Sequence, residues 1–293
     1  MPIRELAYMV VGSPDIEGWK SFAEDVVGFA ADRTDRGELL LKMDERDYRM
    51  MIVPHDTEHV LATGWAVNNE ASYRAMRKSL LEAGVQVRDA RADEAARRRV
   101  QALCTFDDPA GNGIELCWGV ISDFKPFVSP IGVSRFMTGE LGMGHIALPA
   151  PELEASRQFW TELMGFSLSD ILTMPFAGQE VKLYFTHCDN RRQHSLALAG
   201  ISYPKGCVHF AVEMPSIVEV GQAMDRVERA GLKMAMTLGQ HVNDNAISFY
   251  FLTPGGLMME IGCEGMLMDW ERHNVFETTS PSRWGHKFVL TQA

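Results

Sequence analysis

Three polar side chains stand inside short apolar runs of this sequence, where a bound metal ion would account for them. They are His145 in the run 142–148, His209 in the run 207–213 and Glu260 in the run 257–262. A carboxylate buried among apolar residues is costly unless a positive group pairs with it. Two imidazoles and one carboxylate can form a facial triad, which binds ferrous iron and leaves coordination positions open for other ligands.

Each of these residues has an ordinary explanation when it is taken alone. A single histidine on a strand is more often a hydrogen-bonded core residue than a metal ligand. A single glutamate at a strand end more often points to solvent. The case for a joint role therefore depends on how the chain is organised.

The two halves of the chain repeat one pattern. Residues 6–15 resemble residues 143–152, and residues 64–67 align with residues 209–212. Single residues continue the match, pairing Phe22 with Phe159, Gly28 with Gly165, Pro109 with Pro254 and Glu115 with Glu260. A repeat of this length indicates a duplicated domain. We predict an N-terminal domain over residues 1–135 and a C-terminal domain over residues 136–293.

The two halves differ at the positions that could bind metal. The alignment places Tyr8 at the position of His145, Gly64 at that of His209 and Glu115 at that of Glu260. Most of the nine histidines lie in the C-terminal half. We therefore expect one metal site, in the C-terminal domain. The N-terminal domain is expected to be a degenerate copy without metal, in which Glu115 has a structural role.

Each half also repeats a smaller unit of one strand, one helix and two or three further strands. Helices are predicted over 15–27, 71–83 and 151–164, each ending at or just before a glycine. Short alternating segments predict strands over 38–42, 49–53, 181–186 and 195–199. The order βαβββ, four times over, predicts an α+β fold with open sheets.

Composition and charge exclude several classes of protein. The net charge of −11 disfavours a nucleic-acid partner or an anionic membrane, because both would repel such a surface. The basic run Arg97-Arg98-Arg99 is interpreted as a solvated helix face. No stretch approaches the roughly 18 consecutive apolar residues that span a bilayer, and no secretory signal is expected. Five cysteines without CxxC spacing are typical of reduced thiols in a cytoplasmic protein.

The most specific stretch is 239–250, which reads Gly-Gln-His-Val-Asn-Asp-Asn-Ala-Ile-Ser-Phe-Tyr and is followed by Thr-Pro-Gly-Gly and Glu260. Together with Trp284-Gly285-His286 near the end, it resembles the C-terminal signature of two-domain type I extradiol dioxygenases of the vicinal oxygen chelate superfamily. The resemblance covers essentially the whole chain and is strongest to 2,3-dihydroxybiphenyl 1,2-dioxygenases. Met258-Met259 and Ala147 depart from many relatives and leave the choice of substrate open.

The resemblance implies a fold, an activity and a set of site residues. It implies two curled mixed sheets, each around a cleft, and extradiol cleavage of a catechol-type aromatic in aromatic-compound catabolism. The metal would be Fe(II), with Mn(II) the less favoured alternative, and O2 would be the co-substrate. His194 aligns with the family's acid/base, and His241 and Tyr250 align with residues that hydrogen-bond the substrate. The substrate-binding positions by alignment are Ala147, Phe185, Asn243, Asp244, Ile247 and Pro281.

Some of these side chains have two interpretations. Asp244 could orient His241 or form a turn with Asn243. Met174 and Met258 could line an adaptable pocket wall, although methionine is more often a core filler. The other histidines are given no chemistry: His187 and His286 are expected to be structural, and His55, His59 and His273 to lie on the surface.

The expected partner is a small catechol, and a homo-oligomer without nucleic acid or membrane contact is predicted. Dihydroxybiphenyl, dihydroxynaphthalene and steroid-derived catechols all fit the residues. Two rival functions stay open at this point. One is a metal-dependent isomerase or lyase of the same superfamily, such as glyoxalase I. The other is a ligand-binding protein without chemistry.

Overall fold

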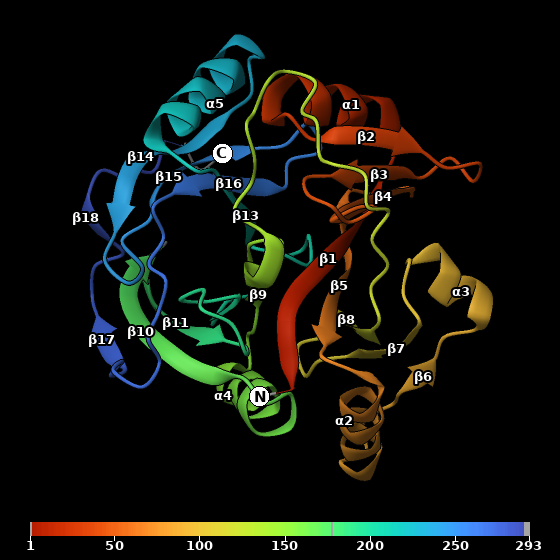
Figure 1. Cartoon of the computed structure of the whole chain (residues 1–293). Coiled ribbons are helices and arrows are strands. Elements are labelled where there is room, and N and C mark those ends of the chain that lie inside the picture. The colour runs from red at the N-terminus through yellow and green to blue at the C-terminus, as the bar shows by residue number, and fades with distance from the viewer. Residues whose placement is uncertain (1, 177, 290–293) are drawn as a thin grey trace.

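The computed structural model describes residues 2–176 and 178–289, which form two curled mixed sheets (Figure 1). The first module contains β1 (Ile3–Ser13), α1 (Ile16–Ser21) with a π-helical continuation (Phe22–Val27), β2 (Ala30–Arg33), β3 (Leu39–Lys42) and β4 (Met50–Pro54). The second contains β5 (His59–Val67), α2 (Glu70–Glu82), β6 (Arg88–Asp89), α3 (Ala92–Arg97), β7 (Ala102–Asp107) and β8 (Gly113–Trp118).

The C-terminal domain repeats this order and adds two short strands. Its first module contains β9 (His145–Pro149), α4 (Leu153–Gln158) with a π-helical continuation (Phe159–Leu163), β10 (Ser167–Phe176), β11 (Gln179–His187) and β12 (Leu196–Ala199). Its second contains β13 (His209–Glu213), α5 (Ile217–Arg229), β14 (Met234–His241), β15 (Ile247–Leu252) and β16 (Met258–Cys263). The additional strands are β17 (Phe276–Thr278) and β18 (Ser282–Trp284). The prediction of four βαβββ modules is confirmed.

The two sheets have the same strand order. It is β2-β3-β4-β1-β5-β8-β7-β6 in the N-terminal sheet and β10-β11-β12-β9-β13-β16-β15-β14 in the C-terminal one, flanked there by β17 and β18. In each sheet the first strands of the two modules pair antiparallel, as β1 with β5 and β9 with β13. The segment between β8 and β9 contains one short 3₁₀ turn (Gly139–Leu141), and the predicted domain boundary lies within it.

Capping residues fix where the helices begin. The side chain of Asp15 accepts a hydrogen bond from the Gly18 N–H, Asn69 from the Ser72 N–H and Ser216 from the Glu219 N–H. Such caps satisfy backbone donors that have no partner inside a helix. At the end of the first helix Gly28 adopts a φ of 92°, which a residue without Cβ accepts readily. Polar capping residues and terminal glycines of this kind are the sequence signals from which helix ends are predicted.

The two domains share one hydrophobic core. The rings of Trp65, Trp160 and Phe166 lie 5.1 to 5.4 Å apart, centroid to centroid, and join the two sheets. Phe22 and Phe251 make a second contact between the domains at 6.1 Å. Apolar side chains from both halves therefore pack together beneath the C-terminal sheet. No helix among the described residues is long and apolar enough to cross a membrane.

The strand register corrects one detail of the sequence alignment. The paired residues are Tyr8 with Gly64 and Val10 with Ala62 in the N-terminal sheet, and His145 with Ala211 and Ala147 with His209 in the C-terminal sheet. The structural counterpart of His209 is therefore Ala62, not Gly64. A slip of two residues leaves every side chain on its own face, so the apolar pattern cannot reveal it.

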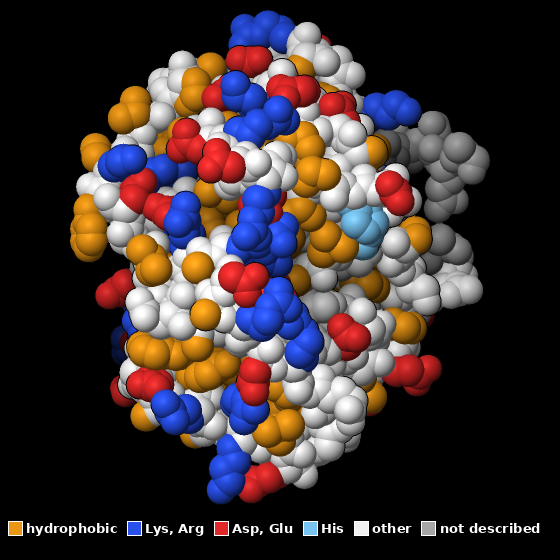
Figure 2. Space-filling model, turned by 90° about the vertical axis from the view of Figure 1, so that its right-hand side faces the viewer, with side chains coloured by type: hydrophobic (Ala, Val, Ile, Leu, Met, Phe, Trp, Pro, Cys, Tyr) orange, Lys and Arg blue, Asp and Glu red, His pale blue; other side chains and the backbone are white. Residues whose placement is uncertain are grey.

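The basic run Arg97-Arg98-Arg99 is not the solvated helix face that we expected. The side of the N-terminal domain carries a band of Lys and Arg side chains with Asp and Glu beside it (Figure 2). Arg97 pairs with Glu38, Arg98 with Glu115 and Arg99 with Asp47. The Arg98 side chain is only 15% exposed, because α3 ends just before it and the chain turns inward toward β8.

Candidate active site

Three neighbouring strands bring His145, His209 and Glu260 together. His145 begins β9, His209 begins β13 and Glu260 lies within β16, and β13 is the middle strand of the three. Ala211 pairs with His145 on one side and with Glu260 on the other. His209 precedes Ala211 by two residues, so all three side chains leave the same face of the sheet.

The three side chains present their ligand atoms to one point. His145 Nε2 lies 3.1 Å from His209 Nε2 and 3.1 Å from Glu260 Oε2, and the distance from His209 Nε2 to Glu260 Oε2 is 3.4 Å. Ligand atoms about 2.1 Å from a common ion at right angles are separated by about 3 Å. Glu260 Oε2 is buried and lacks a hydrogen bond among the described residues. The donor set and its geometry therefore fit a divalent metal ion.

Electrostatics keep this cluster in the form that binds a cation. Burial alone would raise the pKa of Glu260, but the neighbouring His145 and His241 rings outweigh it and hold that pKa well below its usual range. Burial lowers the pKa of His209 to about 3. A carboxylate and a neutral imidazole are the protonation states that a metal ligand needs.

His194 lies beside the cluster, before β12. Its ring is 4.2 Å from that of His145, centroid to centroid, and it is buried. Its Nδ1 lies 2.7 Å from Gln193 Oε1, which leaves Nε2 for the cavity that His194 lines. Burial lowers the pKa of His194 well below the usual value, with His145 as the next cause.

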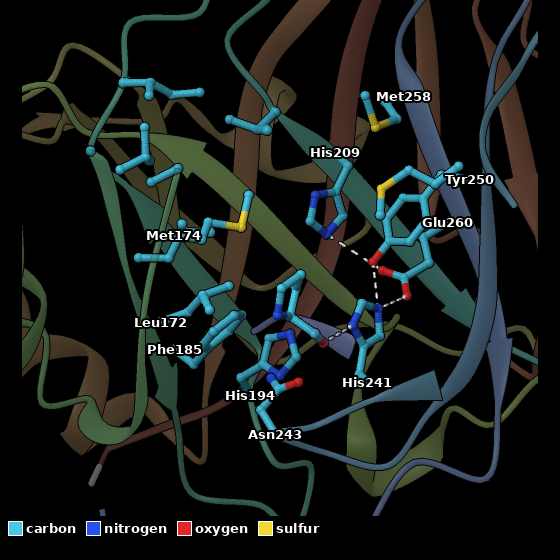
Figure 3. A pocket seen from close by; sticks show the side chains of 18 of the residues that line it. Leu172, Met174, Phe185, His194, His209, His241, Asn243, Tyr250, Met258 and Glu260 are labelled. Carbon is cyan, nitrogen blue, oxygen red and sulfur yellow. Dashed lines mark hydrogen bonds and ion pairs between the residues drawn. The ribbon is translucent and has the colours of Figure 1, made fainter. Parts of the chain in front are cut away.

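His241 and Tyr250 lie beside Glu260 (Figure 3), and His241 Nε2 is 3.3 Å from Glu260 Oε1. The Tyr250 hydroxyl is 2.8 Å from His241 Nε2, and His241 Nδ1 is 3.0 Å from the carbonyl oxygen of Pro281. The carbonyl can only accept, so Nδ1 carries a proton and donates it there. Burial raises the pKa of Tyr250 well above the usual value, so its hydroxyl keeps its proton.

A cavity of about 590 Å³ opens in front of these groups. Figure 3 shows Leu172, Met174 and Phe185 on the wall across from Glu260 and Tyr250. Its walls are mainly apolar, and the polar groups converge at the cluster. A mainly apolar cavity with a few convergent polar groups is the usual form of a small-molecule site.

The structure brings most of the predicted site residues together. His145, His194, His209, His241, Tyr250 and Glu260 line the cavity, and so do Phe185, Asn243, Asp244 and Pro281. Ala147 does not line it: its side chain is fully buried behind the wall formed by Leu172 and Phe185. Ile247 also lies outside the lining and packs against the main core.

Asp244 forms a turn and does not contact His241. Its Oδ1 accepts a hydrogen bond from the Ala246 N–H at 2.9 Å. Its Oδ2 lies 3.9 Å from His194 Nδ1 instead. The turn interpretation therefore describes its local role, and the nearest histidine is a different one from the one we expected.

The remaining histidines are mostly placed as expected. His187 and His286 are buried, and burial lowers the pKa of each to about 4. His55 is exposed and His59 is half-buried beside it. His273 is not a free surface residue, because its Nε2 donates to the Ser169 carbonyl at 2.8 Å.

Several residues of the site were not found from the sequence. Leu172, Leu183 and Val208 line the cavity, and Gln193 and Asp170 stand behind His194. Alternation along 167–176 indicates a strand, but it does not say which face meets the ligand. Asp170 lies in the mixed segment Ser167-Leu168-Ser169-Asp170-Ile171, so its position gives no signal comparable to that of His145.

Comparisons with known proteins agree with this site. Residues 142–261 match the family described as "Glyoxalase/Bleomycin resistance protein/Dioxygenase superfamily", and residues 6–54 match "Dihydroxybiphenyl dioxygenase BphC D1". The chain is 38% identical to an iron-dependent extradiol dioxygenase of Rhodococcus jostii (strain RHA1), covering 99% of both chains. It is also 38% identical to biphenyl-2,3-diol 1,2-dioxygenase of Paraburkholderia xenovorans (strain LB400), covering 100% of this chain and 98% of the other.

Solved structures agree with the sequence comparisons. The fold is similar to that of BphC, a halotolerant catechol dioxygenase, with a TM-score of 0.91, 32% identity and coverage of 98% of this chain and 95% of the other. The fold and the histidine–carboxylate site thus define a protein of the vicinal oxygen chelate superfamily. Within it, the chain belongs to the two-domain extradiol dioxygenases.

Proposed function

We propose that this enzyme is an oxidoreductase that opens a catechol ring beside its two hydroxyl groups, in the catabolism of a bicyclic aromatic such as 2,3-dihydroxybiphenyl. The observation that carries the proposal is the triangle of His145 Nε2, His209 Nε2 and Glu260 Oε2 beside an apolar cavity. The relative named biphenyl-2,3-diol 1,2-dioxygenase, at 38% identity over the full chain, supports this substrate class.

The metal in this proposal is Fe(II), held by His145, His209 and Glu260. When bound, a ferrous ion would supply open positions for the catechol oxygens and O2 and a path for electron transfer between them. Two neutral imidazoles and one carboxylate leave a divalent ion with net charge +1. This local positive charge favours a dianionic or monoanionic catechol as ligand. The relative described as iron-dependent supports Fe(II) over Mn(II).

His194 holds or moves the proton in this proposal. Its Nδ1 is occupied by Gln193, so Nε2 is the atom that takes a proton from the catechol and later returns it. An imidazole suits this task because its ordinary pKa of about 6.5 lies near neutrality. The depressed pKa of His194 means that it starts as a neutral base.

His241 and Tyr250 orient the substrate hydroxyl. The Tyr250 hydroxyl keeps its proton and donates it, and the Tyr250–His241 contact of 2.8 Å holds both side chains in place. We further propose a cytoplasmic enzyme, because its five cysteines are buried free thiols that form no disulfide. The homo-oligomeric state stays a prediction.

One experiment tests metal and reaction together. Protein purified without O2 is analysed for metals, then mixed with 2,3-dihydroxybiphenyl in air while O2 uptake and product colour are followed. We expect one iron per chain, one O2 consumed per substrate and a yellow, conjugated ring-opened acid. His209→Ala should lose iron and activity, whereas His55→Ala, at an exposed histidine outside the site, should keep both.

Other outcomes of this experiment separate the rival functions. A colourless muconate would mean cleavage between the two hydroxylated carbons and would contradict the proposal. Metal binding without O2 uptake would favour an isomerase or lyase. Tight binding of the catechol to metal-free protein, without turnover, would favour a ligand-binding protein.

A further inference from the structure

A buried carboxylate outside the cavity, that of Asp170, is linked to His194 through the side chain of Gln193. We propose that Asp170, acting through Gln193, is a positioning residue that fixes which ring nitrogen of His194 carries the proton. The proposal deepens the proposed function, because it rests on His194 being the base in ring opening. The protonated ring nitrogen of His194 can be measured without turnover.

The contacts form a continuous chain of three side chains. Gln193 Nε2 donates to Asp170 Oδ2, and Gln193 Oε1 lies 2.7 Å from His194 Nδ1. All three residues are buried, and Asp170 is fully inaccessible to solvent. The other carboxylate oxygen, Asp170 Oδ1, accepts from the Phe276 N–H at 3.4 Å.

The charge on Asp170 determines the orientation of the amide. A carboxylate can only accept hydrogen bonds, so the Gln193 NH2 group must face it. The Gln193 oxygen then faces His194, and Nδ1 must carry the proton that it accepts. Nε2 is left without a proton on the cavity side, where the base has to act.

Other groups near His194 do not set its tautomer. Asp244 Oδ2 is 3.9 Å from Nδ1, which is beyond hydrogen-bond distance. Ser169 contacts the backbone carbonyl of Gln193 and His187 Nδ1, and it makes no contact with His194 itself. The side-chain amide of Gln193 is therefore the deciding partner, and its orientation follows from Asp170.

The N-terminal domain shows that this arrangement is not simply a feature of the fold. Asp170 and Asp32 occupy equivalent positions in the two sheets. Asp170 pairs with Phe185, and Asp32 pairs with Leu40. Asp32 is exposed on β2, an edge strand of its sheet, whereas β17 pairs with β10 at Asp170 and that carboxylate is buried. The same side chain is thus buried only in the domain that has a histidine to orient.

The sharpest test is Asp170→Asn, which keeps the shape and reverses one hydrogen bond. The Phe276 N–H holds the new amide oxygen, so the new NH2 faces Gln193. Gln193 must then rotate to offer its oxygen, and its own NH2 faces His194 Nδ1. Nδ1 becomes an acceptor, and the proton moves to Nε2.

The tautomer is measured by ¹⁵N NMR of histidine-labelled protein loaded with Zn²⁺, which is diamagnetic. The His194 signal is assigned from its loss in His194→Gln. Burial raises the pKa of Asp170 to about 7, so the spectra are recorded at pH 8, where the carboxylate dominates. We expect the proton on Nδ1 in the wild type and on Nε2 in Asp170→Asn.

Turnover should follow the tautomer. In the iron-loaded enzyme Asp170→Asn should lower kcat by roughly 10²-fold or more, the usual worth of a correctly placed base. KM should change by less than about threefold, because the substrate still meets the metal ligands and Tyr250. Asp32→Asn is the matched control and should change neither value.

A double variant distinguishes this role from simple packing. In Asp170→Asn with Gln193→Glu, the new NH2 donates to the new carboxylate, which accepts from His194 Nδ1. The original tautomer should return, and kcat should recover at least tenfold over Asp170→Asn.

Three results would overturn the proposal: a wild-type proton on Nε2, an unchanged tautomer in Asp170→Asn, or no recovery in the double variant. The wild-type spectrum decides the first point even if a variant does not fold. If the wild type opens no catechol, the proposed function fails while the tautomer result stands on its own.

Discussion

The two domains bury the same glutamate at the same place in the sheet and neutralise it in different ways. Glu115 on β8 accepts two hydrogen bonds from Arg98, each 2.8 Å long, and a third from the Tyr8 hydroxyl at 2.7 Å. Glu260 on β16 faces His145 and His209 and keeps one oxygen without a donor. In the N-terminal domain a guanidinium therefore balances the buried carboxylate, as a metal ion would in the C-terminal domain.

This difference is the basis for predicting a single metal site, in the C-terminal domain. Both oxygens of Glu115 accept hydrogen bonds from Arg98 or Tyr8, and Ala62 stands where His209 would be. A permanently charged arginine needs no metal to balance the carboxylate. No arginine or lysine among the described residues pairs with Glu260. Burial lowers the pKa of His241, but Glu260, whose Oε1 is 3.3 Å from His241 Nε2, raises it to about 9, so His241 partly balances that oxygen and Oε2 is left for a metal ion.

The largest expected effect comes from removing a metal ligand. Native protein should contain one iron per chain, and His209→Ala should lose it together with all measurable activity, because a two-ligand site binds iron weakly. Metal analysis and O2 uptake measure both effects, with His55→Ala as the control. Two irons per chain in the wild type would break the comparison, since Glu115 would then be a ligand as well.

The next effect concerns the stability of the N-terminal domain. Arg98→Ala leaves Glu115 buried without its cation and should lower the free energy of unfolding by about 2–4 kcal/mol, near the lower end for a broken buried pair because Arg98 is 15% exposed. Denaturant unfolding measures the change.

Two further variants sharpen this result. Arg98→Met with Glu115→Gln removes both charges and should cost less than Arg98→Ala alone. Arg91→Ala, at an exposed arginine, should have almost no effect. Iron content per folded chain should stay at one in all of these variants, and a loss of iron in Arg98→Ala would contradict the separate roles of the two domains.

A smaller effect is expected on the choice of substrate. The apolar wall of the C-terminal cavity should hold the second ring of a bicyclic catechol, and burying one ring stabilises binding by about 1.5–3 kcal/mol. The kcat/KM for 2,3-dihydroxybiphenyl should then exceed that for catechol by roughly 10–10²-fold. Met174→Ala should reduce this preference and leave kcat/KM for catechol nearly unchanged. An equal loss for both substrates would place Met174 outside the contact with the second ring.

Much of this structure could be predicted because the two halves of a duplicated chain can be compared position by position. The modules follow from strand and helix periodicity, and histidines inside apolar strands are visible without coordinates. Tyr8 at the position of His145 predicts which copy lacks the metal site. The geometry of the triad follows once three neighbouring strands carry these residues on one face.

The contacts that the sequence could not predict depend on register and on turns. A slip of two residues put Gly64 in the place of Ala62, because alternation is preserved under such a shift. Arg98 reaches Glu115 only because α3 ends at Arg97 and the next residue turns inward. Asp170 is buried where β17 pairs with β10, a contact between distant segments that no local pattern of apolar residues encodes.

The smallest expected effect separates the two equivalent aspartates, Asp32 and Asp170, by pH. Burial raises the pKa of Asp170 to about 7, and Asp244 adds to this effect, while the Phe276 N–H, His273 at 3.7 Å and Gln193 oppose it. An unfolded aspartate has a pKa of about 3.9. Between these two values the folded protein holds a proton that the unfolded chain releases. The free energy of unfolding therefore falls as the pH rises from about 4 to about 7, and no further loss follows above that.

Asp170→Asn has no such proton, so its thermal midpoint relative to the wild type should be higher at pH 8 than at pH 5. The expected change is a few degrees, since about 1 kcal/mol corresponds to about 2–4 °C in a chain of this size. Asp32→Asn, measured at the same scan rate, should show no pH-dependent difference because its carboxylate is exposed. A variant that gains stability at pH 8 while losing turnover would mean that the buried charge is retained for the orientation of His194 at the expense of stability. An equal midpoint difference at pH 5 and pH 8 would instead show that the carboxylate is ionised throughout this range and that its hydrogen bonds fully offset its burial.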